Sequence, residues 1–151
     1  MTRTSLVDRD CPLARASGIL GDPWALMIVR DAMEGVTTFS EFRRRSGAAP
    51  SVLTSRLERL TAAGVLERIR TGPAVERYCY RLTEKGRDLL PAIVALMQWG
   101  ERWEFEGSSG VAVLDAGTNR PIPAVRVRRS DGESMELAHL RVRRSVPSRN
   151  E

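Results

Sequence analysis

The chain has 151 residues, of which 42% are hydrophobic and 28% charged, and its formal net charge is +5. This length suits one principal core rather than two full domains, and the composition is ordinary for a soluble globular protein. Because no apolar run approaches the roughly 18 residues of a membrane helix and the first residues lack a secretory signal, we expect a cytoplasmic protein without a membrane partner.

Two helices are predicted near the N-terminus, with a sharp restart of the chain between them. Cys11-Pro12 begins the first helix, because proline is favoured in a first turn, and Gly21 ends it. Asp22 is the expected N-cap of the second helix, which ends near Gly35. Its side chains are apolar on almost every side, so we expect this helix at the centre of the core.

Two further helices are predicted after short turns. The third begins at Thr38 and ends at Gly47, with its phenylalanines expected to face inward and the arginines at positions 43–45 in solvent. The fourth spans residues 50–63, where leucines spaced by four and three residues form one apolar stripe. Its opposite side is polar and basic, which is the kind of helix face that suits a DNA groove.

A two-stranded ribbon, or wing, is predicted next. Residues 65–70 and 77–82 alternate apolar and polar side chains, as half-buried strands do, and Thr71-Gly72-Pro73 supplies the turn between them. On the second strand we expect Cys79 on the polar face, opposite to the two tyrosines. Both strands carry arginines, so the wing is expected to be basic.

A long apolar helix is predicted after Thr83, with Pro91 expected to kink or divide it. Its apolar face is wider than the core of so small a domain can cover, which favours a partner subunit. The composition then shifts to short alternating runs with a hairpin signal at Asp131-Gly132. These runs are Val111 to Leu114, Val125 to Arg128 and Leu137 to Val142. We therefore expect a first domain over residues 1–106 and a small β-hairpin-rich extension over residues 107–151.

The predicted order of elements is that of a winged helix-turn-helix, a mainly α protein of the α+β class with a long C-terminal dimerisation helix. The segment 35–82 holds nine arginines against four glutamates, an excess of +5 that equals the net charge of the whole chain. One helix of such a fold enters the major groove while the wing meets phosphates or the minor groove, so we predict double-stranded DNA as the partner. The expected contacts are Arg43, Arg44, Pro50, Ser51, Thr54, Ser55, Arg56, Arg59, Arg68, Arg70 and Arg77. Among them, Arg56 and Arg59 are the first candidates for base contacts.

Several short motifs are separately characteristic of one family. They are Cys11-Pro12, Gly21-Asp22-Pro23-Trp24, Arg30-Asp31, Phe39-Ser40-Glu41-Phe42, Leu53-Thr54-Ser55-Arg56-Leu57, Gly64-Val65-Leu66 and Tyr80-Arg81-Leu82-Thr83-Glu84-Lys85-Gly86. With them the chain resembles the HxlR-type branch of MarR-like transcriptional regulators over residues 11–103. The resemblance implies a homodimer paired through its first and last helices, and operators that are inverted repeats. It also implies that Cys11 matches an N-terminal cysteine that senses electrophiles or oxidants in some members.

The chain departs from the family pattern at two places. Ala48 and Ala49 stand where the family usually has a larger apolar residue followed by a small one, which predicts a less tightly seated recognition helix. Longer relatives carry a zinc-ribbon-like set of Cys and His in the tail, whereas residues 107–151 contain no Cys and only His139. We therefore expect no metal and no cofactor.

Two interpretations of Cys11 stay open. As the N-cap of a helix its thiolate is stabilised, and the neighbouring arginines favour a redox sensor while the neighbouring aspartates oppose it. The alternative is a partly buried packing residue at a dimer interface. A sensing role is less favoured for Cys79. The sequence leaves open a disulfide between Cys11 of one subunit and Cys79 of another.

Two other functions compete with DNA binding. A thiol enzyme with Cys11 as nucleophile needs a general base, and the single histidine lies in the tail, so we expect no enzyme. The other is a ligand-binding or protein-interaction module that has kept the winged helix without DNA recognition. If a small-molecule effector regulates the protein, we expect it between the dimer helices beside Trp24, Trp99 or Trp103, whose alternative role is packing.

Overall fold

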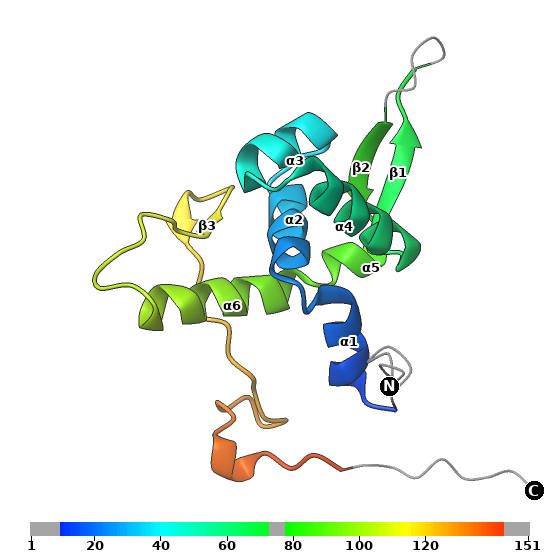
Figure 1. Cartoon of the computed structure of the whole chain (residues 1–151). Helices are drawn as coiled ribbons and strands as arrows, with labels where there is room; N and C mark the ends of the chain where they lie inside the picture. The colour runs from blue at the N-terminus through cyan, green and yellow to red at the C-terminus, as the bar shows by residue number, and fades with distance from the viewer. Residues whose placement is uncertain (1–9, 73–77, 144–151) are drawn as a thin grey trace, which may run out of the picture. The chain divides into compact units, whose positions relative to one another are not determined.

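The computed structural model describes residues 10–72 and 78–143, which divide into two compact units between Ile93 and Val94. The first unit begins with four helices, which are followed by a two-stranded wing (Figure 1). The helices are α1 Pro12–Leu20, α2 Pro23–Met33, α3 Phe39–Ser46 and α4 Pro50–Ala62. These bounds confirm the four predicted helices to within two residues at each end. The wing projects beyond α3 and α4, at the opposite end of this unit from α1.

The helix ends form where their capping chemistry predicts. The Asp22 carboxylate accepts hydrogen bonds from the backbone amides of Trp24 and Ala25, which satisfies two of the free donors at the start of α2. Thr38 and Glu41 form a reciprocal capping box at the start of α3. Gly47 ends that helix with φ at +66°, a left-handed conformation that glycine adopts without strain.

The core of the first unit lies between α2, α3, α4 and the base of the wing. Phe42 and the three leucines of the α4 stripe are completely or almost completely buried, as predicted. In α2, however, only one side is buried, while Trp24 in the first turn is 36% exposed. The fully buried apolar side chains are Ile28, Val29, Phe42, Leu53, Leu57, Leu60, Val65 and Leu66.

The wing consists of β1 Leu66–Arg70 and β2 Tyr78–Leu82, paired antiparallel. Leu66 pairs with Leu82 and Ile69 with Cys79. The prediction that Cys79 lies on the polar face is wrong, because its side chain is only 6% exposed. The sequence pattern misleads here because the tyrosines and Leu82, assigned to the inner face, are each half-buried instead. The part of the predicted turn at Pro73 and the prediction for Arg77 lie outside the described residues.

Pro91 divides the predicted long helix. Thr83 caps a short helix, α5 Glu84–Arg87, by accepting a hydrogen bond from the amide of Gly86. A second helix, α6 Leu90–Trp103, begins immediately before Pro91. Proline has no amide hydrogen to donate and fits only the first turn of a helix, which explains the break.

The tail contains much less β structure than predicted. Its strands are β3 Leu114–Asp115 and β4 Arg120–Pro121, with one isolated bridge between Arg128 and Ser134 around the Asp131-Gly132 turn. Leu137–His139 is a turn of 3-10 helix, so the predicted strand there is wrong. The alternating pattern overestimates the strands because most tail residues described stay exposed, and without a buried face alternation does not select a strand.

None of the described helices has the length and apolar character needed to cross a membrane.

Candidate nucleic-acid interface

The turn between α3 and α4 sets the exposed face of α4. The chain leaves α3 at Gly47, and the backbone amide of Ala48 then donates to the Ser46 hydroxyl at 3.2 Å. Ala48 is buried while Ala49 and Pro50 are exposed, and Pro50 occupies the first turn of α4. The small Ala48 therefore fits against the core at the position where a larger apolar side chain is usual in the family that the sequence resembles.

The outward face of α4 is polar and carries no free cation. Ser51, Thr54 and Glu58 are exposed, and Ser55 between them is half-buried. On a helix these positions lie opposite to the buried leucine stripe. Ser51, Thr54 and Ser55 were predicted contacts, whereas the sequence reasoning gave no role to Glu58.

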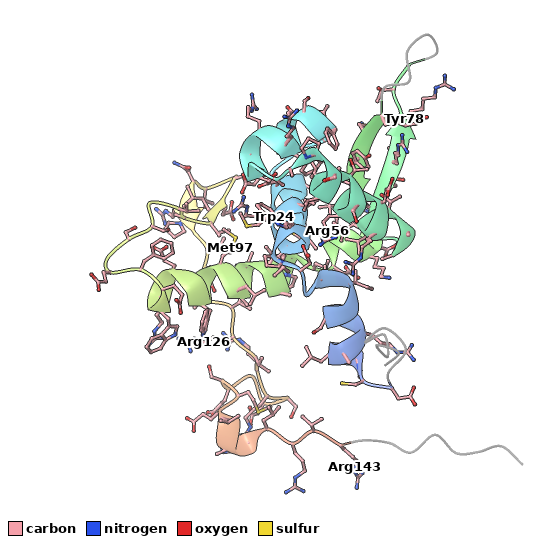
Figure 2. All side chains as sticks on the ribbon, in the orientation of Figure 1. Trp24, Arg56, Tyr78, Met97, Arg126 and Arg143 are labelled. Atoms are coloured by element: carbon pink, nitrogen blue, oxygen red, sulfur yellow. The ribbon has the colours of Figure 1, made fainter. Side chains whose placement is uncertain are left out.

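Arg56 lies on the flank of α4 and points to the junction of α1 and α2 (Figure 2). Its Nη2 is 2.7 Å from Oδ2 of Asp22, and its Nη1 donates to the Ser55 hydroxyl at 3.3 Å. Its Nε is buried with no hydrogen-bond partner in the part of the chain that the structure describes. The ion pair raises the pKa of Arg56, and the hydrogen bond from Arg56 is the main reason that the pKa of Asp22 lies below its ordinary value.

Arg59 is also connected to the same junction. Its Nη2 donates to the backbone carbonyl of Gly18, near the end of α1, at 3.0 Å, although the side chain is exposed. Both arginines of α4 thus have intramolecular partners. The sequence reasoning identified Asp22 only as a helix cap, and no local sequence signal pairs it with Arg56, which lies on another helix.

The exposed cations near α4 come from α3 and from the wing. Arg43 and Arg44 are exposed in the last turn of α3. The next residue, Arg45, is instead paired with Glu34 and lies 3.6 Å from the buried carboxylate of Asp31, which Arg30 also contacts at 2.7 Å. Arg45 therefore connects α3 to α2, whereas the side chains of Arg43 and Arg44 are exposed.

The wing presents Arg68 and Arg70 on β1. Both are exposed, and the Arg68 guanidinium lies 3.6 Å from the centre of the Tyr78 ring, a cation–π contact that orients it (Figure 2 labels Tyr78). The base of the wing is fixed by Tyr80, whose amide donates to the Thr37 carbonyl at 2.7 Å and whose ring packs edge-on against Phe42.

A groove of about 580 Å³ separates α4 from the wing. Thr54 and Glu58 line it from α4, and Arg68 and Tyr78 from the wing. Of the residues predicted to bind DNA, Thr54 therefore lines this groove from α4 and Arg68 lines it from the wing, whereas Arg56 and Arg59 are bound at the junction of α1 and α2.

The other predicted site residues lie apart from this face. Cys11 is exposed and is the N-cap of α1, although its side chain makes no capping hydrogen bond. Trp24 belongs to the first compact unit, and the exposed Trp99 and Trp103 lie on the part of α6 in the second unit, so a common effector pocket stays a prediction. No cluster of three metal-ligating side chains occurs among the described residues.

Comparison with known proteins gives the family. The model of the HxlR-like helix-turn-helix matches residues 19–107, which include α2 to α6. The chain belongs to the HxlR-like helix-turn-helix family. This HxlR-like chain is 43% identical over 91 residues to Rv3095 of Mycobacterium tuberculosis, an uncharacterised HTH-type transcriptional regulator, and the match covers 60% of this chain and 58% of that protein. The match thus spans less than two thirds of the length of this relative.

Three further comparisons support the fold. YybR of Bacillus subtilis, another uncharacterised HTH-type transcriptional regulator, is 34% identical over 98 residues, which cover 60% of this chain and 74% of YybR. The crystal structure of PA1607, suggested to be a transcription factor, has a TM-score of 0.88 and 38% identity and covers 94% of this chain and 100% of its own. The redox regulator HypR in its reduced form has a TM-score of 0.58 and 29% identity, covering 61% of this chain and 92% of its own. The winged helix-turn-helix fold is thus confirmed.

Proposed function

We propose that this transcriptional regulator binds a specific operator as a homodimer, with one α4 of each subunit in the major groove of an inverted repeat. The observation that carries the proposal is the arrangement of α4, whose outward face is polar and is flanked by exposed arginines on both sides. A polar helix face reads base edges in the major groove, and flanking cations neutralise the phosphates on either side of it.

The contacts divide into two kinds. We expect Ser51, Thr54 and Ser55 to bond base edges, because they share the outward face near the start of α4. We expect phosphates to be met by exposed arginines on either side, which are Arg43, Arg44, Arg68 and Arg70. Phosphate contacts fix the register of the protein, and base contacts select the sequence.

The operator is found by selecting bound duplexes from a random library and then measuring affinity against salt by fluorescence anisotropy. We expect an inverted repeat and a log–log slope of about −0.9 for each phosphate contact. Arg68→Ala should weaken binding to all duplexes alike, whereas Thr54→Ala should change the preferred base at one position in each half-site and cost about 1–3 kcal/mol. Enrichment of no common sequence at about 50 mM salt would overturn the proposal.

The homodimer is supported by the exposed apolar face of α6. Leu96, Trp99 and Trp103 are 52%, 56% and 62% exposed, respectively, in the single chain. Large apolar side chains repeated on one side of a helix mark an interaction surface in a soluble protein. A twofold dimer would also bring two copies of α4 to the two halves of an inverted repeat.

A redox signal through Cys11 is the favoured mode of regulation. The thiol is exposed at the start of α1, and the similar structure of HypR is that of a redox regulator. Operator affinity is measured before and after treatment with an oxidant, in the wild type and in Cys11→Ser. We expect only the wild type to lose binding; identical behaviour would contradict a sensing role.

A further inference from the structure

Asp22 connects two elements with its two carboxylate oxygens. Oδ1 accepts the amides of Trp24 and Ala25 at 3.0 and 3.3 Å and caps α2, while Oδ2 binds Nη2 of Arg56 on α4 at 2.7 Å. The pair is shielded from solvent, since the side chains of Arg56 and Asp22 are 24% and 20% exposed. The start of α2 and the middle of α4 are thus held together by one carboxylate.

The guanidinium of Arg56 is directed away from the outward face of α4. Nη2 is bound to Asp22, Nη1 donates to Ser55 on the same helix, and Nε is buried. The planar guanidinium has a rigid set of donors, so its binding to the junction fixes the orientation of the whole group. In this conformation the donors that would read a guanine face the protein.

The position of this contact determines how α4 is rotated. Arg56 lies on one flank of the helix, between the buried leucine stripe and the outward residues, and Arg59 one turn later donates to the Gly18 carbonyl. The leucine stripe alone leaves α4 free to rotate slightly, because apolar packing is not directional. Two directional contacts on one flank restrict that rotation, and rotation decides which outward side chains reach the base edges.

We propose that Arg56 is a positioning residue that determines operator preference through Asp22, without contacting DNA itself. The inference rests on the proposed binding of α4 in the major groove. It makes Ser51, Thr54 and Ser55 the specificity-determining side chains, and it assigns to the pair of Arg56 and Asp22 the task of holding them in register with the bases.

Two single variants separate this role from a DNA contact. Arg56→Met removes the charge and retains a long apolar side chain, while Asp22→Asn removes the ion pair and retains a residue that caps helices well. Affinity of each full-length variant is measured for the selected operator and for a scrambled duplex, as a function of salt. Thermal melting of each variant checks that it is folded.

We expect both variants to lower the ratio of operator to scrambled affinity by a similar amount, on the order of tenfold, as for two residues of one contact. The double variant should lose no more than either single one, and the salt slope of all three should equal that of the wild type. Arg44→Met is the matched control. Loss of this exposed arginine is expected to reduce the magnitude of the salt slope by about one and to leave the ratio of operator to scrambled affinity unchanged.

A different outcome would overturn the inference. If Arg56→Met lowers the salt slope by about one, Arg56 contacts a phosphate directly. If Asp22→Asn keeps the wild-type ratio while folded, the ion pair does not determine operator preference. If Arg56→Met fails to fold, Asp22→Asn alone decides, since it keeps the cap of α2. A wild type that prefers no duplex at all would instead refute the proposed function, so the two failures are distinguishable.

Discussion

At the scale of single residues, Asp22 has two roles, and sequence reasoning identifies only one of them. Its role as a helix cap is predictable because capping depends on neighbouring residues of the chain. Its ion pair with Arg56 is not, because the two residues belong to different helices and the pattern of α4 only places Arg56 on the polar side. A side chain as long as arginine reaches either the outward face or the flank from the same position, and sequence periodicity does not distinguish them.

The pair of Asp22 and Arg56 predicts a dependence of stability on pH. Because the pKa of Asp22 is lowered in the folded protein, its carboxylate stabilises the fold above its unfolded pKa of about 3.8 and loses this effect as the pH falls through the folded value. We expect Asp22→Asn to be about 1 kcal/mol less stable than the wild type at pH 7, roughly 3 °C in melting temperature.

Melting curves between pH 7 and pH 2 test this prediction. The difference between the wild type and Asp22→Asn should stay constant down to about pH 5 and decrease toward zero at the acid end. A difference that persists unchanged at the lowest pH would show that the charge of Asp22 contributes nothing to stability.

At the scale of elements, α5 depends on a close approach that only glycine permits. A Cβ at Gly86 would lie 2.2 Å from the Val65 carbonyl oxygen and 2.9 Å from Cδ2 of Leu82. Since the carbonyl belongs to the backbone next to β1, it has little freedom to move. We expect Gly86→Ala to lower the free energy of unfolding by about 1–3 kcal/mol, as overpacking does.

Gly100 provides the matched control on α6. Among the described residues, no atom lies within 4 Å of a Cβ built there, apart from the backbone of the helix itself, so the same substitution meets no clash in this part of the chain. Gly100→Ala should stabilise the helix by up to about 1 kcal/mol, because alanine has the higher helix propensity. Urea denaturation of both variants measures the two effects, and equal effects of the same sign would contradict the close approach at Gly86.

The success of prediction differs between the helices and the tail for a physical reason. The helices are bounded by caps, prolines and glycines such as Thr38, Gly47 and Pro91, which act locally and can be read directly. The tail strands are predicted from alternation and from turn signals such as Asp131-Gly132, and alternation selects strands only when one face is buried. The interior position of Cys79 was missed because the wing has side chains of intermediate burial on both faces.

At the scale of the whole molecule, the family explains the winged helix but not the tail. The HxlR-like model ends at residue 107, while PA1607 covers 94% of the chain and therefore includes much of the tail. A DNA-binding role can be predicted for the winged helix because its charges and helix order fit the geometry of DNA. The tail offers no such pattern, since its six described arginines are spread over mostly exposed chain.

The proposed homodimer predicts that a charge on the apolar face of α6 separates the subunits. Trp99→Glu should convert a dimer to a monomer and weaken operator binding, because a buried unpaired carboxylate is costly in an interface. Analytical ultracentrifugation at several concentrations measures the change. Glu104→Ala, at an exposed position just beyond α6, is expected to leave the assembly unchanged, and a dimeric Trp99→Glu would place the interface elsewhere.

The unequal burial of the two thiols makes opening of the wing measurable through the native cysteines. An alkylating reagent should modify Cys11 at once, whereas Cys79, 6% exposed, should react only when β2 opens from the core. The slow phase of alkylation in Cys11→Ser therefore reports how often the wing opens. If bound DNA holds the wing closed, the operator should slow the alkylation of Cys79. The rate of this reaction would then report contact between the wing and DNA.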